Sequence, residues 1–233
     1  MEPVSTSGRN GGYFSPDLGN RGRWPINEGE HYVKKFLTVL AIASSLLLTG
    51  CSQTNEAASI GDFKISQTEI QTSIDSVMAE RTKVDTSQMQ LETGEDLNRG
   101  QLRFKILMHT FDEIAKELKL EVTSSQIESQ KARILESIGG KAELPKNLVN
   151  AAIAPQDFDI YVRAIVISDQ ISAALTQAGV AEADVSAKVS ELLSAKSKSL
   201  GVKINPRYGV WDNEAGDVVA ANVTGDAVKP SAK

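Results

Sequence analysis

The sequence predicts a mainly α-helical domain, a bundle of about five to six helices with very little sheet. Apolar residues recur at helical spacing in one segment after another between residues 66 and 200. Helix-forming residues such as Ala, Leu, Lys, Glu and Gln are plentiful, while aromatic residues make up only 5% of the chain. Short alternating stretches typical of strands occur only near the two ends of this region, at 60–65 and 202–205.

The segment Val33–Cys51 has the pattern of a secretory signal. Two lysines precede an apolar run from Phe36 to Leu48, which is shorter than the roughly 20 residues that span a bilayer. The run ends in Leu-Thr-Gly-Cys, which resembles the lipobox of bacterial lipoproteins. In that class the cysteine sulfur receives a diacylglyceryl group, and cleavage leaves the cysteine as the first mature residue. An ordinary signal peptide or a buried helix is the alternative, but Cys51 is the single cysteine of the chain.

This interpretation divides the chain. Residues 33–50 form the signal peptide, and residues 1–32 are a polar leader without an apolar period, either disordered or mis-assigned. We favour Val33 as the true initiator, read from a GTG codon behind the purine-rich codons expected for residues 27–30. Peptides from 11–23 in a mass spectrum of the unprocessed precursor would exclude that hypothesis.

Composition limits the function classes. The formal net charge is −5, which argues against a nucleic-acid partner. With Cys51 acylated, the exported domain has no cysteine left for a disulfide. Only His109 remains after the signal, within a predicted helix, so neither a catalytic triad nor a zinc site is expected. No Gly-rich phosphate loop follows a strand. We therefore predict no catalytic residue, no cofactor and no metal.

The first half of the mature chain is predicted from start and stop signals. Residues 51–59 form a polar tether, and Gly61-Asp62 lies in a hairpin or a bent strand over 60–65. A capping box at Ser66 and Glu69 opens a helix over about 67–81. Residues 83–94 form a loop, and a longer helix begins at Asp96 and carries an apolar stripe through Leu118.

The second half follows the same logic. A second capping box, Thr123 with Gln126, opens a helix that Gly139-Gly140 ends. A short helix over 144–154 precedes a helix that starts near Pro155, is apolar on more than one face and is expected to be central. Another helix covers 182–200, a strand follows at 202–204, and residues 213–233 are predicted to be a disordered tail.

The segment 204–212 is the densest unusual stretch. One interpretation is structural: a strand, a turn preset by Pro206, and Tyr208 and Trp211 covering the edge of a core. The other is a recognition surface, since Arg, Tyr and Trp dominate binding hot spots. We favour the structural interpretation.

The layout as a whole resembles the actinobacterial lipoproteins that carry a SurA N-terminal-type domain, related to the chaperone module of SurA and to the PrsA foldases. The resemblance covers about 59–212. It rests on the lipobox, the strand at 60–65, the capped helix at Ser66, the break at 154–158 and the closing motif Asn205, Pro206, Arg207, Tyr208, Gly209, Trp211 and Asp212. It implies a helical holdase for unfolded exported polypeptides, and a pairing of 60–65 with 202–205.

Many relatives also carry a parvulin-type prolyl isomerase domain, for which the helical region 66–200 leaves no room. We therefore expect a non-enzymatic chaperone, anchored through Cys51 to the extracytoplasmic face of the cell membrane. Met78, Met89 and Met108 are candidate adaptable contacts to clients, with Met108 more typical of a core filler. A structural or partner-binding lipoprotein of the cell envelope and a foldase with residual isomerase activity are the alternatives.

Overall fold

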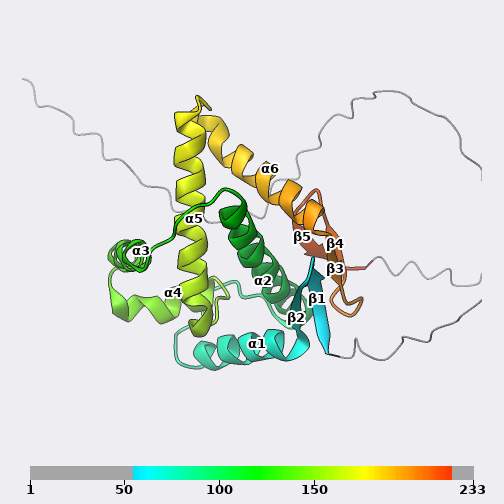
Figure 1. Ribbon diagram of the computed structural model, residues 1–233. Coiled ribbons are helices and arrows are strands. Elements are labelled where there is room, and N and C mark those ends of the chain that lie inside the picture. Colours follow the sequence, from blue (N-terminus) through cyan, green and yellow to red (C-terminus); the bar gives the residue numbers. More distant parts are fainter. Residues whose placement is uncertain (1–54, 222–233) are drawn as a thin grey trace, which may run out of the picture. The chain divides into compact units, whose positions relative to one another are not determined.

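Residues 55–221 are described by a computed structural model (Figure 1). The predicted leader, the predicted signal peptide, Cys51 and the end of the predicted tail lie outside these described residues. Within the described part the chain forms six α-helices and five short strands, with two 3-10 turns. In order, they are β1 Glu56–Ile60, β2 Phe63–Ser66, α1 Gln67–Arg81, α2 Gly94–Glu117, α3 Ser124–Ser137, η1 Lys141–Glu143, α4 Leu144–Asn150, η2 Pro155–Asp157, α5 Phe158–Gln177, α6 Glu182–Leu200, β3 Val202–Ile204, β4 Val210–Asp212 and β5 Asp217–Val219.

The mainly helical prediction is confirmed, and local signals account for the helix ends. Both α1 and α6 have the predicted bounds, and α6 ends at Gly201 with a left-handed φ of 70°. Thr123 and Gln126 cap α3 reciprocally, as predicted. At α1 only half of the predicted box is present: Ser66 Oγ accepts from Glu69 N at 3.0 Å, while the Glu69 side chain is directed elsewhere.

A three-stranded antiparallel sheet, in the order β2-β1-β3, joins the two ends of the domain. Ala58 pairs with Ile204 and Ile60 with Val202, so the expected pairing of N-terminal and C-terminal strands is confirmed. Of the two alternatives predicted for 60–65, the hairpin is the one observed, so only Ile60 of this stretch pairs with β3. Gly61, with a φ of 57°, turns the chain back, and β2 pairs with the opposite edge of β1.

The tether prediction is wrong for Glu56–Ser59, which form most of β1. Ala57 is 0% exposed and Ala58 is 1% exposed, so this stretch belongs to the core. Its polar, small-residue composition is typical of a linker, and the pairing that orders it comes from a strand far away in the sequence.

The tail prediction is also wrong for its first residues. The strand β5 pairs with β4, and Val218 is 4% exposed. The turn between these strands is stabilised by Asp212, whose Oδ1 accepts from the backbone N–H groups of Glu214 and Ala215. The stretch 217–219, Asp-Val-Val, lacks the alternation that indicated β3, so periodicity did not predict a strand there.

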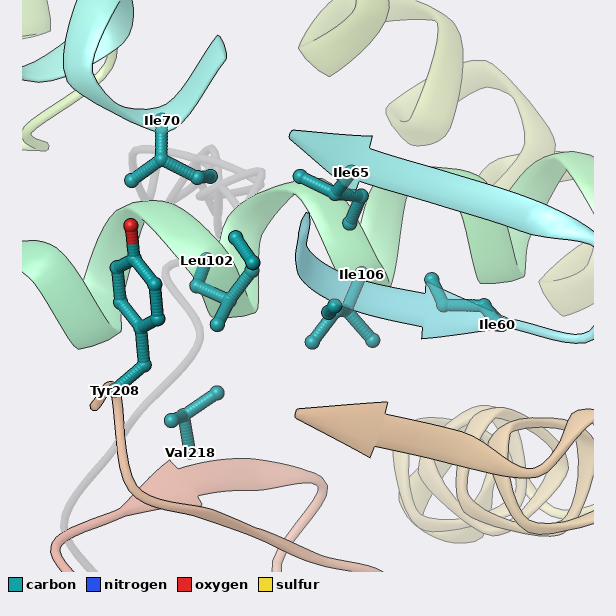
Figure 2. Packing of buried hydrophobic residues seen from close by; sticks show 9 residues of the cluster. Ile60, Ile65, Ile70, Leu102, Ile106, Tyr208 and Val218 are labelled. Carbon is teal, nitrogen blue, oxygen red and sulfur yellow. The ribbon is translucent and has the colours of Figure 1, made fainter. Parts of the chain in front are cut away.

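Apolar side chains from both ends of the domain form one cluster, which we call the sheet-end cluster (Figure 2). Strands β1 and β2 contribute Ile60 and Ile65, and helices α1 and α2 contribute Ile70, Leu102 and Ile106. Each of these five is at most 1% exposed, and each such burial contributes about 1.5–3 kcal/mol to folding. The remaining members come from the ends of the chain: Ala57, Ala58, Tyr208 and Val218.

Helix α5 is central to the other half of the described domain, as predicted. It contacts α2, α3 and α6. Ile167, with 0% exposure, and Ile171 pack with Phe111 and Ile114 of α2 and with Val189 of α6. Met108 is partly buried against this second cluster, which agrees with its interpretation as a core filler. The second cluster holds the long helices together without any contribution from the sheet.

Candidate binding site

An open pocket of about 370 Å³, which we call the polar pocket after the residue types that line it, lies where the first turns of α1 meet α2 and η2, and most of its exposed lining surface comes from the carbon atoms of those residues. Its volume is at the lower end of the range for small-molecule sites. Every lining residue is polar or charged: Ser66, Thr68, Glu69, Thr72, Ser73, Lys105, Gln156 and Asp157.

The wall of this pocket is a buried arrangement of three side chains, which we call the polar network. Asp157 is 4% exposed, and its two carboxylate oxygens are used separately. Lys105 Nζ donates to Oδ1 at 2.6 Å, and Ser73 Oγ donates to Oδ2 at 2.8 Å. Both donors are also buried, Ser73 to 1% exposure and Lys105 to 9%. An ion pair at this depth needs such full hydrogen bonding to offset the desolvation of its charges.

Three elements distant in sequence position the polar network. Ser73 lies on the buried face of α1 between Ile70 and Val77, and Lys105 follows Leu102 on the buried face of α2. Asp157 is the last residue of η2, and its backbone N–H donates to Ala154 O at 2.8 Å. Pro155 starts this turn and favours the extended conformation of Ala154, whose ψ is 141°. The Ala-Pro break predicted from the sequence therefore places the carboxylate.

Glu69 lies at the more open side of the pocket. Its Oε1 is 3.5 Å from Lys105 Nζ, and its side chain is 41% exposed. This contact explains why Glu69 does not complete the predicted capping box. Lys105 thus lies between two carboxylates, one buried and close, the other exposed and more distant. The pocket consequently has one more negative charge than positive charge among its lining side chains.

The geometry suits binding better than covalent catalysis. A serine nucleophile must present its oxygen to a substrate and to a base. The hydroxyl of Ser73 is buried and donates to a carboxylate that Lys105 also engages. At the rim, Thr68 Oγ1 already donates to Asn55 Oδ1 and Thr72 Oγ1 to Thr68 O, so the amide of Gln156 and the Glu69 carboxylate are the groups that remain to engage a ligand.

Asn205, the first residue of the closing motif, connects the C-terminal part of the described domain to strand β1 through hydrogen bonds. Asn205 N donates to Ala57 O at 2.9 Å, and Asn205 Nδ2 donates to Glu56 O at 3.0 Å. Pro206 lies in the turn that follows, where Tyr208 N donates back to Asn205 O at 2.9 Å. Arg207 is exposed and donates from its guanidinium to Gln67 Oε1 on α1.

The rest of the motif is packed, as the structural interpretation predicted. Tyr208 is 8% exposed in the sheet-end cluster, where burial raises the pKa of its phenol, and Trp211 packs against the same cluster. The indole Nε1 of Trp211 is buried without a hydrogen-bond partner. Gly209 has a φ of 120°, and a Cβ there would lie 2.1 Å from Val219 O. Asp212 caps the β4–β5 turn.

His109 has a packing role among the described residues. Its ring stacks on Phe63 of β2, with centroids 4.0 Å apart and an interplanar angle of 10°. Burial lowers the pKa of His109, a shift that the nearby Glu113 carboxylate opposes. Within residues 55–221, no group of three or more His, Cys, Asp or Glu side chains is arranged to hold a metal ion. In that same part of the chain, no helix is both long enough and apolar enough to cross a membrane.

Sequence reasoning missed the polar network. One signal was available: Ser73 and Lys105 each interrupt an apolar stripe at a position whose helical neighbours are buried. That pattern identifies a polar group that needs a buried partner. It does not identify Asp157, which is 84 positions from Ser73 and 52 from Lys105.

Comparisons with models of protein families, with curated proteins and with solved structures find no match to this chain.

Proposed function

We propose that this protein is a membrane-anchored extracytoplasmic chaperone, a holdase that binds unfolded exported polypeptides without a catalytic step. The observation that carries the proposal is the pairing of β1 with β3. The resemblance to lipoproteins with a SurA N-terminal-type domain predicted that pairing, whereas composition and periodicity did not. The signal pattern and the Leu-Thr-Gly-Cys sequence at Cys51 supply the anchor in this proposal.

Dispersed apolar side chains would make the contacts with clients. Six large apolar side chains are between 36% and 50% exposed, and each comes from a different part of the described domain. Single exposed apolar residues are common on soluble proteins, so they favour many weak contacts over one high-affinity interface. An extended, unfolded client would touch several of them at once, which raises its total affinity. They are Phe63, Met78, Leu118, Ile160, Leu192 and Val210.

The experiment is an aggregation assay with the lipidated chain purified from membranes. A chemically unfolded test protein is diluted into buffer with and without the chain, and light scattering is followed. The holdase proposal expects slower aggregation in a dose-dependent manner. Unchanged aggregation in the presence of folded chain, checked by circular dichroism, would refute it.

A structural or partner-binding lipoprotein is the second candidate, and the polar pocket is the observation that favours it. A preformed network of buried charges suits one defined ligand better than a variety of clients. Cross-linking in cells separates the two candidates. Many different exported polypeptides would be captured by a holdase, and one dominant partner by a protein with a fixed ligand.

A further inference from the structure

The described chain is attached to the first turn of α1 at Asn55. Its backbone oxygen accepts from Gln67 N at 2.8 Å, and its side-chain Oδ1 accepts from Thr68 Oγ1 at 3.3 Å. Strand β1 begins at the next residue. The ordered domain therefore begins much closer to Cys51 than the polar composition of 52–59 indicates.

Cys51 stands four positions before Asn55. Four residues of extended chain span at most about 14 Å, whatever conformation they adopt. We propose that the face formed by Asn55, Gln67, Thr68, Asn205 and Arg207, here called the anchor face, lies against the lipid headgroups of the membrane. This inference rests on the acylation of Cys51, which is part of the proposed function.

The chemistry of the anchor face fits a headgroup layer. Asn205 Nδ2 donates a hydrogen bond to Glu56 O, and the Arg207 guanidinium donates one to Gln67 Oε1. The face is therefore polar, and hydrogen bonds hold its segments together. Arg207 is exposed, and its planar guanidinium is well suited to lipid phosphate oxygens. The acidic balance of the chain disfavours contact between its remaining surface and an anionic bilayer, which favours this one orientation.

The orientation has a consequence for the polar pocket. Thr68 belongs to the anchor face and also lines the pocket, and Ser66 lines the pocket next to Gln67 of that face, so the pocket opens close to the headgroups. Helix α5 starts directly after Asp157 and is 20 residues long, so its far end lies about 30 Å from the pocket. In Figure 1, α5 begins near α1 at the bottom of the view and ends at the top, where α6 begins, so its far end points away from α1.

The test uses the lipidated full chain in vesicles that contain a phospholipid with a nitroxide on its headgroup. Because acylation occupies Cys51, an introduced cysteine is the only free thiol for a fluorophore. Thr68→Cys and Pro206→Cys place the label on or directly beside the anchor face and keep the Arg207 guanidinium, and Gln177→Cys places it at the far end of α5. All three positions are exposed. We expect quenching at both anchor-face positions and loss of quenching at position 177, because the far end of α5 lies about 30 Å from the pocket.

A linker variant supplies the matched control. Inserting about ten Gly and Ser residues after Ser52 releases the domain from the surface, so quenching at Thr68→Cys should fall to the level at Gln177→Cys. Equal quenching at all positions in the unmodified tether would overturn the orientation while leaving the anchor intact. A chain that fails to float with vesicles would overturn the anchoring itself, and the orientation with it.

Discussion

The sheet-end cluster and the polar network join the same two helices with opposite chemistry. Ile70 of α1 packs in one cluster with Leu102 and Ile106 of α2. One turn further along α1, Ser73 is linked through Asp157 to Lys105, which lies between those two α2 residues in sequence. The contact between α1 and α2 is therefore apolar at the sheet-end cluster and charged at the polar network, although the two sets of residues are neighbours on both helices.

The sheet-end cluster and the polar network differ in how strictly each contact depends on particular partners. An apolar contact depends on the area removed from water and tolerates small changes of shape. A buried ion pair is stable only when every charge keeps its partner. We therefore expect the sheet-end cluster to supply stability in graded amounts, and the polar network to fix one arrangement of α1, α2 and η2.

Removal of Asp157 should have the largest effect. Asp157→Ala leaves the buried Lys105 ammonium and the Ser73 hydroxyl without their acceptor, and should lower the free energy of unfolding by about 3–5 kcal/mol. Urea unfolding of the purified chain measures it. Asp159→Ala is the matched control, since Asp159 is 69% exposed, and it should leave the midpoint nearly unchanged.

The double variant Lys105→Met with Asp157→Asn tests the reason for that loss. It removes both charges together and keeps an acceptor for Ser73, so most of the stability should return. A double variant as unstable as Asp157→Ala would show that the loss comes from altered packing around η2 and not from an unpaired charge.

Truncation in the sheet-end cluster should come next. Ile70 is 0% exposed, and Ile70→Ala should lower the free energy of unfolding by about 3 kcal/mol through lost burial and a residual cavity. Met78→Ala on the same helix is the control, because Met78 is 46% exposed. Equal effects of the two substitutions would contradict the assignment of Ile70 to a closely packed core.

The two N-caps allow a smaller comparison. Ser66→Ala removes a single hydrogen bond, to Glu69 N, and should cost about 1 kcal/mol. Thr123→Ala removes two hydrogen bonds of the hydroxyl, which accepts from Gln126 N at 3.2 Å and donates to Gln126 Oε1 at 3.1 Å, while the backbone N–H of residue 123 keeps its bond to Gln126 Oε1. The loss at Thr123 should equal or exceed the loss at Ser66. A larger loss of thermal stability at Ser66 than at Thr123 would contradict this inference. It would mean that α1 depends more strongly on Ser66 because the Glu69 side chain contacts Lys105 and does not cap the helix.

The smallest expected effect is a pH dependence from His109. Burial lowers the pKa of His109 below its ordinary value of 6.5. As the pH falls through that value, the unfolded chain takes up a proton before the folded chain does, so the free energy of unfolding decreases. His109→Gln removes this contribution. The urea midpoint of the variant should therefore change less between about pH 7.5 and about pH 5.5 than that of the unmodified chain. Identical changes in the two chains would contradict the burial of His109 against Phe63.

Local signals in the sequence predicted the helices and their caps, because such signals act within a few residues. The bounds of α1 and α6 follow from Ser66 and Gly201. Strand β3 was predicted, but β1 and β5 were missed, because β1 is ordered by a partner distant in sequence and β5 by a turn. The polar network was missed for the same reason: nothing near Asp157 in the chain indicates that Lys105 and Ser73 converge on it.

The most direct test of the holdase proposal is aggregation suppression by a surface variant. Leu118→Ser, Leu192→Ser and Val210→Ser together remove three dispersed apolar side chains that are between 38% and 50% exposed, so the fold should persist. Gln88→Ser with Gln177→Ser changes exposed polar positions and serves as control. We expect the lipidated chain and the control to slow aggregation of an unfolded protein equally, and the triple variant to lose about half of that effect. A triple variant as effective as the unmodified chain, at equal stability, would contradict the proposal that these side chains hold clients.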